Sequence, residues 1–129
     1  PDIVIIKLGT NDSKPENWEY KDEFQLDLEY MVRTFKHCGS KPKIILCRCI
    51  PAGNNLYGIR NDVITKEIYP IQRKVAKKFH LKLVDLYTPF EQKVDSTYYV
   101  WDNVHLNKKG SCILAGYIYR AITGKKFTK

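Results

Sequence analysis

The sequence predicts an α/β fold in which a parallel sheet is covered by helices on both faces to give three layers. Two observations carry this prediction. Three short apolar runs of strand length alternate with three longer segments whose apolar residues recur at helical spacing. Alternation of this kind builds a parallel sheet linked by right-handed crossover helices. No repeat, linker or low-complexity tract interrupts the sequence, so we expect a single unit over residues 1–129.

The predicted strands are mostly apolar runs, without the regular polar alternation of a half-exposed strand. Such runs suit strands that are buried on both faces, as in parallel sheets. Gly9 closes the first strand and Pro51 ends the second. We expect the three strands at residues 2–8, 43–50 and 81–86.

Each predicted helix keeps one apolar stripe, as a helix packed against a sheet requires. We expect the three helices at about residues 24–35, 64–79 and 108–122. Pro70 lies inside the second helix and should kink it, or restart it as a first-turn proline, because proline has no N–H to donate. Asn107 is the expected N-cap of the third helix, since its side-chain oxygen can accept hydrogen bonds from the first N–H groups.

Basic residues outnumber acidic ones, with 22 Lys and Arg against 14 Asp and Glu, for a net charge of +8. A basic balance is compatible with a nucleic-acid partner. The basic clusters nevertheless lie at 73–74 and 77–78 on the polar face of a predicted helix and at 125–129 in the tail, where charges usually solvate the surface. No apolar run reaches the ~20 residues that cross a bilayer. We therefore expect neither nucleic acid nor membrane as a partner.

The cysteines show no metal-binding or redox spacing, because no C-x-x-C pair and no Cys/His zinc pattern is present. Cys47 and Cys49 lie two apart in the second predicted strand, so both side chains are expected on one face of the sheet. We expect buried free thiols at all four positions, Cys38, Cys47, Cys49 and Cys112.

Two polar motifs carry the chemical information. Residues 9–12 (G-T-N-D) follow the first predicted strand, and residues 101–107 (W-D-N-V-H-L-N) precede the last helix. Ligand sites in open parallel sheets form beyond the carboxyl ends of the strands. Taken alone, each motif also fits an ordinary turn, because Gly, Asn and Asp are common turn residues.

Together the motifs resemble those of the SGNH (GDSL-type) esterase superfamily, which carries G-x-N-D after a buried strand and D-x-V-H-L-N just before its C-terminal helix. The opening P-D-I-V-I-I-K-L-G-T-N-D-S-K-P-x-N-W and the strand L-V-D-L-Y are similar to its acetylxylan- and sialate-O-acetylesterase-like branch. The resemblance covers nearly the whole chain. It implies a flavodoxin-like three-layer α/β/α sandwich and ester hydrolysis without a cofactor or a metal.

The resemblance also implies a role for each motif residue. His105 would be the general base, and Asp102 would fix its tautomer and stabilise the imidazolium. Asn11 would aim its amide NH2 at the developing oxyanion. Gly9 would let the backbone turn closely beneath the site, and Asp12 would hold the loop in place.

Plainer interpretations stay open for several residues. His105 could be an ordinary histidine at a helix entry. His37 and His80 follow predicted helices, where a basic side chain complements the helix dipole, so they are assigned structural roles. Trp18 and Trp101 flank the two motifs and either line a pocket or pack in the interior.

The nucleophile of the family lies in a Gly-Asp-Ser motif that this sequence does not contain, and a second oxyanion glycine has no match. No serine sits at a strand-to-helix turn of the required kind; the serines are Ser13, Ser40, Ser96 and Ser111. We expect residues 1–129 to be the C-terminal portion of one SGNH hydrolase domain, whose N-terminal strand and helix units belong to a missing segment. A general base without a nucleophile cannot form an acyl-enzyme, so this portion alone should be nearly inactive.

Three functional hypotheses follow. In the leading one, the complete protein hydrolyses short O-acyl groups on a carbohydrate by a Ser-His-Asp acyl-enzyme mechanism, so that its partner is a small-molecule or carbohydrate ester. In the alternative, which the absent nucleophile motivates, a non-catalytic relative binds a glycan or a protein in the same crevice. A nucleotide binder ranks last, because no glycine-rich phosphate loop follows any predicted strand.

Overall fold

The computed structural model describes residues 1–95 and 97–127, and its strands form one parallel sheet in the order β1-β2-β3. The strands are β1 (Ile3–Ile6), β2 (Lys43–Arg48) and β3 (Lys82–Asp85). Ile5 of β1 lies opposite Ile45, and Leu83 of β3 lies opposite Leu46. All three lie inside the predicted runs and are shorter than these at one or both ends.

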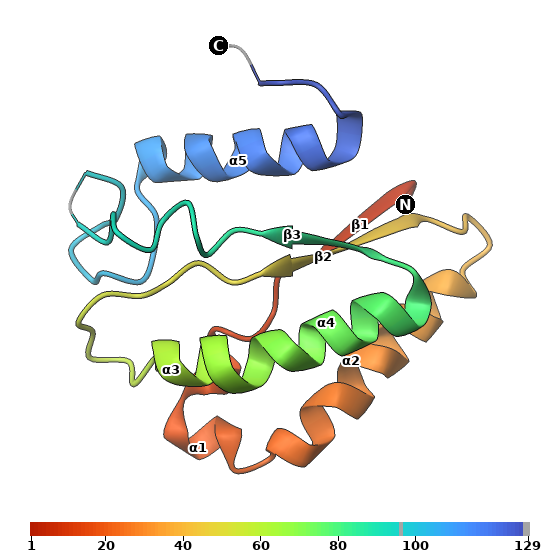
Figure 1. Ribbon diagram of the computed structural model, residues 1–129, viewed down its shortest axis with the longest axis horizontal. Coiled ribbons are helices and arrows are strands. Elements are labelled where there is room, and N and C mark those ends of the chain that lie inside the picture. Colours follow the sequence, from red (N-terminus) through yellow and green to blue (C-terminus); the bar gives the residue numbers. More distant parts are fainter. Residues whose placement is uncertain (96, 128–129) are drawn as a thin grey trace.

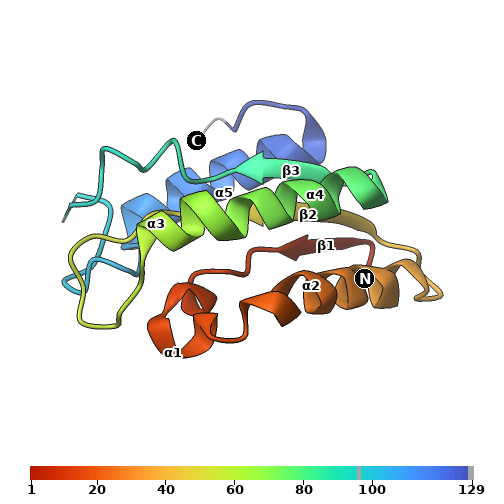
Figure 2. The same cartoon turned by 60° about the horizontal axis from the view of Figure 1, so that its bottom comes forward.

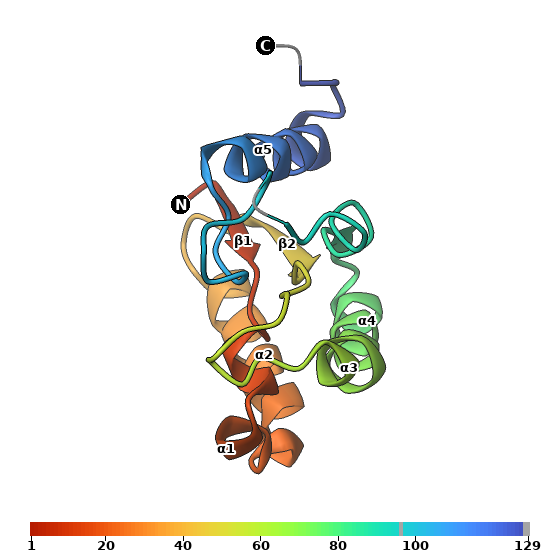
Figure 3. The ribbon, with the colours of Figure 1, turned by 90° about the vertical axis from the view of Figure 1, so that its left-hand side faces the viewer.

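Helices cover both faces of the sheet, so the predicted three-layer α/β/α arrangement is confirmed (Figure 1). The helices α2 (Lys21–Lys36) and α4 (Tyr69–Phe79) lie on one side, and α5 (Lys108–Thr123) lies on the other (Figure 3). The layer under α2 and α4 buries Leu28, Val32, Leu46 and Val75. The layer under α5 buries Ile45, Cys47, Leu86 and Phe90.

Pro70 neither breaks nor ends its helix, which runs without interruption through three differently wound segments. A turn of α3 (Asn61–Val63) is followed by the π-helical η2 (Ile64–Ile68), and Pro70 is then the second residue of α4. Proline has no N–H to donate to the preceding turn, and that turn is the one wound as a π-helix. Asn107 caps α5 as predicted, accepting hydrogen bonds from the N–H groups of Lys109 and Gly110.

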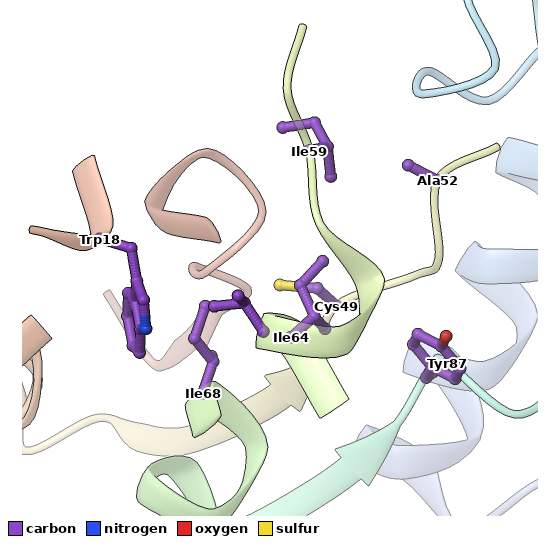
Figure 4. Close-up of a cluster of buried hydrophobic side chains, with 8 residues drawn as sticks. Trp18, Cys49, Ala52, Ile59, Ile64, Ile68 and Tyr87 are labelled. Atoms are coloured by element: carbon purple, nitrogen blue, oxygen red, sulfur yellow. The ribbon is translucent and has the colours of Figure 1, made fainter. Parts of the chain in front are cut away.

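The prediction that Cys47 and Cys49 share one face of the sheet is wrong. Cys47 packs under α5 with Ile45 and Leu86. Cys49 belongs to the core on the other side of the sheet, where Figure 4 shows it beside Ile64 and Ile68. Strand β2 ends at Arg48, so the strict alternation of side chains does not extend to residue 49. Both thiols are buried, but Cys38 and Cys112 are only partly covered. All four are free thiols.

Strand β1 presents an uncovered edge and an uncovered face. Within the described residues no strand pairs with its outer edge. Helix α5 contacts β3, at the other side of the sheet, and leaves Ile3 and Ile5 of β1 39% and 38% exposed. Apolar strand surface of this kind usually packs against further structure.

The carboxyl ends of the strands meet at one end of the molecule, where Figure 2 shows the connecting loops gathering. The loops come from residues 7–20, 51–60, 87–95 and 97–107, and the first of them includes two short elements that were not predicted, η1 (Asn11–Ser13) and α1 (Pro15–Trp18). Among the described residues, no helix has the length and apolar character needed to cross a membrane.

Candidate active site

A cavity of about 420 Å³ opens at the carboxyl ends of β1 and β2. The loop after β1 lines it with Gly9 and Asn11, and the turn before α5 lines it with Val104 and His105. The loop after β2 closes a third side with Ile50, Pro51, Ala52, Tyr57 and Ile59. The fold therefore brings the two polar motifs, which lie far apart in the sequence, to a common space.

His105 is oriented by Asp102 within a tight turn. The ring atom Nδ1 lies 2.7 Å from Asp102 Oδ2, and the carboxylate's other oxygen accepts hydrogen bonds from the backbone N–H groups of Val104 and His105, each at 2.9 Å. Asn103 makes this turn possible by adopting a positive φ of 58°. Among the described residues no hydrogen bond occupies Nε2, the ring atom available to a reacting group.

The surroundings of the two side chains differ sharply. The Asp102 side chain is 7% exposed, whereas that of His105 is 73% exposed. The backbone N–H groups of His105 and Val104, with a smaller contribution from the imidazole, lower the pKa of Asp102 from 3.8 to about 2. Asp102 is therefore a fixed negative charge over the working range of most enzymes, and it can stabilise a protonated imidazole.

The loop after β1 places Asn11 in the lining of the same cavity. Gly9 is buried with a φ of +126°, and a Cβ at this position would lie 2.8 Å from Cγ2 of Ile68, so a side chain has neither the conformation nor the space it needs. The carbonyl oxygen of Asn11 accepts a hydrogen bond from Nδ2 of Asn17 at 2.7 Å. Its own side-chain amide has no hydrogen bond to a described residue, and both of its N–H groups remain available.

Two buried side chains hold this loop from beneath, and sequence reasoning missed both. Nε2 of Gln72 donates to the carbonyl oxygens of Leu8 at 2.9 Å and Cys47 at 3.3 Å. Sγ of Cys49 donates to the same Leu8 oxygen at 3.2 Å. One signal could have revealed Gln72: it lies four residues after Ile68 and three before Val75, on the apolar stripe of its helix.

Ser13 is buried, its hydroxyl is hydrogen-bonded and it does not line the cavity, so it is not placed to act as a nucleophile there. The hydroxyl donates to the Thr10 carbonyl oxygen at 2.7 Å and accepts from the Arg60 N–H at 3.1 Å. Ser40 and Ser111 do not line the cavity, and Ser96 lies outside the described residues. Asp12 lines the cavity, but no hydrogen bond of its carboxylate is found in the described chain; Ser13 and Asn17 hold the loop instead.

The tryptophans that flank the two motifs lie in opposite surroundings. Trp18 is buried in the core shown in Figure 4, and its Nε1 donates to Glu67 Oε2 at 2.9 Å. Trp101 is 84% exposed at the rim of the site. Tyr57 presents its ring edge-on to His105, with 6.5 Å between the ring centroids. His37 and His80 lie at the ends of α2 and α4 and do not line the cavity.

Chemically, the cavity combines a histidine of fixed orientation with an amide donor from the loop after β1. The first is suited to moving a proton, and the second is suited to stabilising a negatively charged oxygen. In the part of the chain that the structure describes, no group of three or more His, Cys, Asp and Glu side chains is arranged to hold a metal ion.

The chain is similar to known proteins over most of its length. Residues 1–111 match the GDSL-like lipase/acylhydrolase family. The chain is 42% identical, over 139 aligned positions, to an acetylxylan esterase of Xylanibacter ruminicola; the match covers 95% of this chain and 28% of that protein.

Solved structures show the same fold. A lipase/acylhydrolase from Enterococcus faecalis superposes with a TM-score of 0.78 and 26% identity, over 100% of this chain and 65% of that one. The acetyl xylan esterase AlAXEase superposes with a TM-score of 0.74 and 22% identity, over 95% of this chain and 67% of that one. The chain thus spans about a quarter of the curated relative and about two thirds of these structures.

Proposed function

This chain belongs to the GDSL-like lipase/acylhydrolase family, and from that premise we propose that the protein containing it is a serine ester hydrolase acting on short O-acyl groups of a carbohydrate. One observation carries the proposal: His105, oriented by Asp102, faces the same 420 Å³ cavity as Asn11. The carbohydrate substrate is suggested by the similarity to an acetylxylan esterase.

The proposed reaction proceeds through an acyl-enzyme. Nε2 of His105 takes the proton of a serine hydroxyl as the serine oxygen attacks the ester carbonyl carbon. Asn11 donates its amide hydrogens to the carbonyl oxygen as that atom becomes negative. The tetrahedral intermediate collapses by releasing the sugar alcohol, which receives the proton from His105. Water then attacks the acyl-enzyme through the same steps and releases the carboxylic acid.

The serine in this scheme comes from a segment outside residues 1–129, which also completes the domain. Two observations support this. Ser13 is unavailable, and neither Ser40 nor Ser111 lines the cavity. Strand β1 also has an unpaired edge and exposed apolar side chains at Ile3 and Ile5, which a preceding strand and helix would cover. Residues 1–129 alone are accordingly expected to be nearly inactive.

A second candidate function is non-catalytic binding of a glycan or a protein in the same cavity. The observation that favours it is that no described serine faces His105. The residues that precede Pro1 in the intact protein decide between the two. A Gly-Asp-Ser motif there supports the hydrolase, and its absence supports the binding protein.

The proposed activity is tested by comparing the full-length protein with its His105→Ala variant on a small acetyl ester. We expect turnover to fall at least ~10³-fold, since removing a triad member has effects of this size. His37→Ala is a matched control, because that exposed ring lies at the far end of α2. Equal turnover by the wild type and the His105→Ala variant would contradict the proposed function.

A further inference from the structure

Three large apolar side chains are exposed to solvent at the rim of the cavity. Leu56 is 99% exposed, Trp101 is 84% exposed and Tyr57 is 42% exposed. With Asn54, Asn55 and Asp102 they line a second hollow of about 200 Å³. Exposed apolar side chains that cluster in this way commonly mark a binding surface, whereas single ones do not.

The hollow adjoins the candidate catalytic residues directly. Asp102, which orients His105 from one side, lines the hollow on the other. Tyr57 lines both the hollow and the cavity, and its ring meets that of His105 edge-on. A ligand resting in the hollow therefore reaches the cavity by passing Tyr57.

The loop that carries Leu56 and Tyr57 is held in one shape by the side chain of Asn55. Its Oδ1 accepts hydrogen bonds from the N–H groups of Tyr57 and Ile59, each at 3.1 Å. Its Nδ2 donates to the carbonyl oxygen of Gly53 at 2.8 Å. The exposed side chains thus project from an ordered backbone, which reduces the entropy that a ligand would have to remove on binding.

The same loop is also fixed to the turn that carries Trp101. The N–H of Gly53 donates to the Asn103 carbonyl oxygen at 2.7 Å, and Nδ2 of Asn103 donates to the Asn54 carbonyl oxygen at 2.9 Å. A Cβ on Gly53 would lie 2.8 Å from Cβ of Asn103, so the two segments are in close contact. The two walls of the hollow are therefore held together as a preformed unit.

We infer that Trp101, Leu56 and Tyr57 form a platform that binds a sugar ring of the alcohol half of a carbohydrate ester. A sugar ring has an apolar C–H face, which lies flat on an aromatic ring or an aliphatic side chain, and a rim of hydroxyl groups, which remain in water or bond to amides such as exposed Asn54. An acyl chain would require an enclosed apolar channel, whereas here the side chains project outward. The hollow is also smaller than the ~300–1,000 Å³ of a ligand-enclosing pocket.

This inference rests on the proposed function and specifies which part of the substrate the rim holds. An ester group attached to a sugar on the platform would extend past Tyr57 into the cavity between His105 and Asn11. A small aryl acetate would bind in the cavity alone. The platform therefore distinguishes substrates by their alcohol half.

The test compares Trp101→Ala with wild type in the full-length protein, using acetylated xylo-oligosaccharide and 4-nitrophenyl acetate as substrates. We expect kcat/KM for the oligosaccharide to fall about tenfold more than kcat/KM for the aryl ester, mainly through KM, and Trp101→Phe to recover part of the difference. Tyr30→Ala is the matched control, because Tyr30 is a similarly exposed aromatic residue on α2, away from the site. Equal losses on both substrates, or no loss on either, would overturn the platform.

A second measurement does not depend on turnover. Deacetylated xylo-oligosaccharide is titrated into wild type and Trp101→Ala while binding heat is recorded. If the protein binds the oligosaccharide, Trp101→Ala weakens that binding and no ester is hydrolysed, the platform stands and the proposed activity is wrong. If esters are hydrolysed but Trp101→Ala leaves oligosaccharide binding unchanged, the activity stands and the platform is wrong. Quenching of tryptophan fluorescence by acrylamide completes the test, because a shielded Trp101 would show that another part of the protein occupies the platform.

Discussion

The two loops that form the candidate site are held in place by different means. The turn at residues 102–107 holds Asp102 and His105 through local bonds, from Asp102 Oδ1, the Val100–His105 backbone pair and the Tyr98–Asn107 pair. Asn103 also ties it to a distant segment, at Gly53 and Asn54. The loop at residues 9–13 depends on Cys49, Arg60 and Gln72, which lie far away in the sequence. The first loop can be altered without disturbing the core, and the second cannot.

This difference between the loops predicts that substitutions in one change the catalytic rate, whereas substitutions in the other change the stability of the fold. The side-chain bonds of Asp102 and His105 are local, so substitutions at these two residues should act on catalysis. The support under Gly9 is shared with the core between the sheet and α4, so substitutions there should act on the free energy of unfolding. The predictions below test this separation, beginning with the largest expected effect.

Asp102→Asn should lower kcat of the full-length protein by ~10⁴-fold, the size seen when this position is changed in Ser-His-Asp triads. The amide NH2 would replace Oδ2 beside Nδ1 of His105, so the ring would hold its proton on the wrong nitrogen. Turnover of an acetyl ester and denaturant unfolding are the measurements. A loss of stability as large as that caused by changing Gln72 would remove the contrast between the loops.

Asn11→Ala should lower kcat by ~10²–10³-fold with little change in KM, because the lost donor acts on the transition state. Asn11→Asp is the sharper comparison: it keeps the size of the side chain but puts a negatively charged acceptor where a donor is needed, so its loss should be greater. A rise in KM at unchanged kcat would assign residue 11 to ground-state binding instead.

The pH dependence of activity should show no contribution from Asp102 above pH 4. The pKa of Asp102 is held at about 2, below its ordinary 3.8, so the carboxylate remains ionised as pH falls from 8 to 4. Asp102 should therefore keep orienting the ring of His105 over this range, and turnover of an acetyl ester as a function of pH is the measurement. A separate loss of activity between pH 3 and 5 would mean that Asp102 protonates there. The stability that Asp102 contributes should likewise be lost only as pH falls from about 4 through 2.

Gln72→Leu should lower the free energy of unfolding by ~1–3 kcal/mol, because the buried carbonyl oxygen of Cys47 loses its Gln72 hydrogen bond and that of Leu8 keeps only the thiol. Its effect on kcat should be only a few-fold, exerted through the position of Asn11. Lys77→Leu is the control, since it introduces the same side chain at an exposed position of α4. A rate loss without a stability loss would contradict the division between the loops.

Features held by local contacts could be predicted from the sequence, whereas features held by distant residues could not. The strands and long helices were readable because each carries its own periodicity, and the Asp102–His105 pair was readable because both partners lie in one turn. The short helix α1 shows no periodicity, and its Trp18 is fixed by a hydrogen bond to Glu67, 49 residues away. The support of Leu8 by Cys49 and Gln72 also required the folded structure.

Predictions from local sequence patterns were wrong where a pattern was extended past the end of its helix or strand. Cys49 was assigned to the face of Cys47 on the assumption that the strand continued through residue 50, whereas β2 ends at Arg48. The two tryptophans could not be told apart by sequence, because both flank a motif. Their exposure, which differs from one extreme to the other, is decided by tertiary packing alone.

The unpaired edge of β1 has one more consequence, for how the domain can be divided. A strand edge offers backbone N–H and C=O groups in a fixed register, to which a separately produced peptide can add by β-augmentation. A polypeptide carrying the proposed N-terminal units, mixed with residues 1–129, would therefore be expected to restore a working enzyme from two inactive halves. The turnover recovered by such a pair would measure the association of the two fragments.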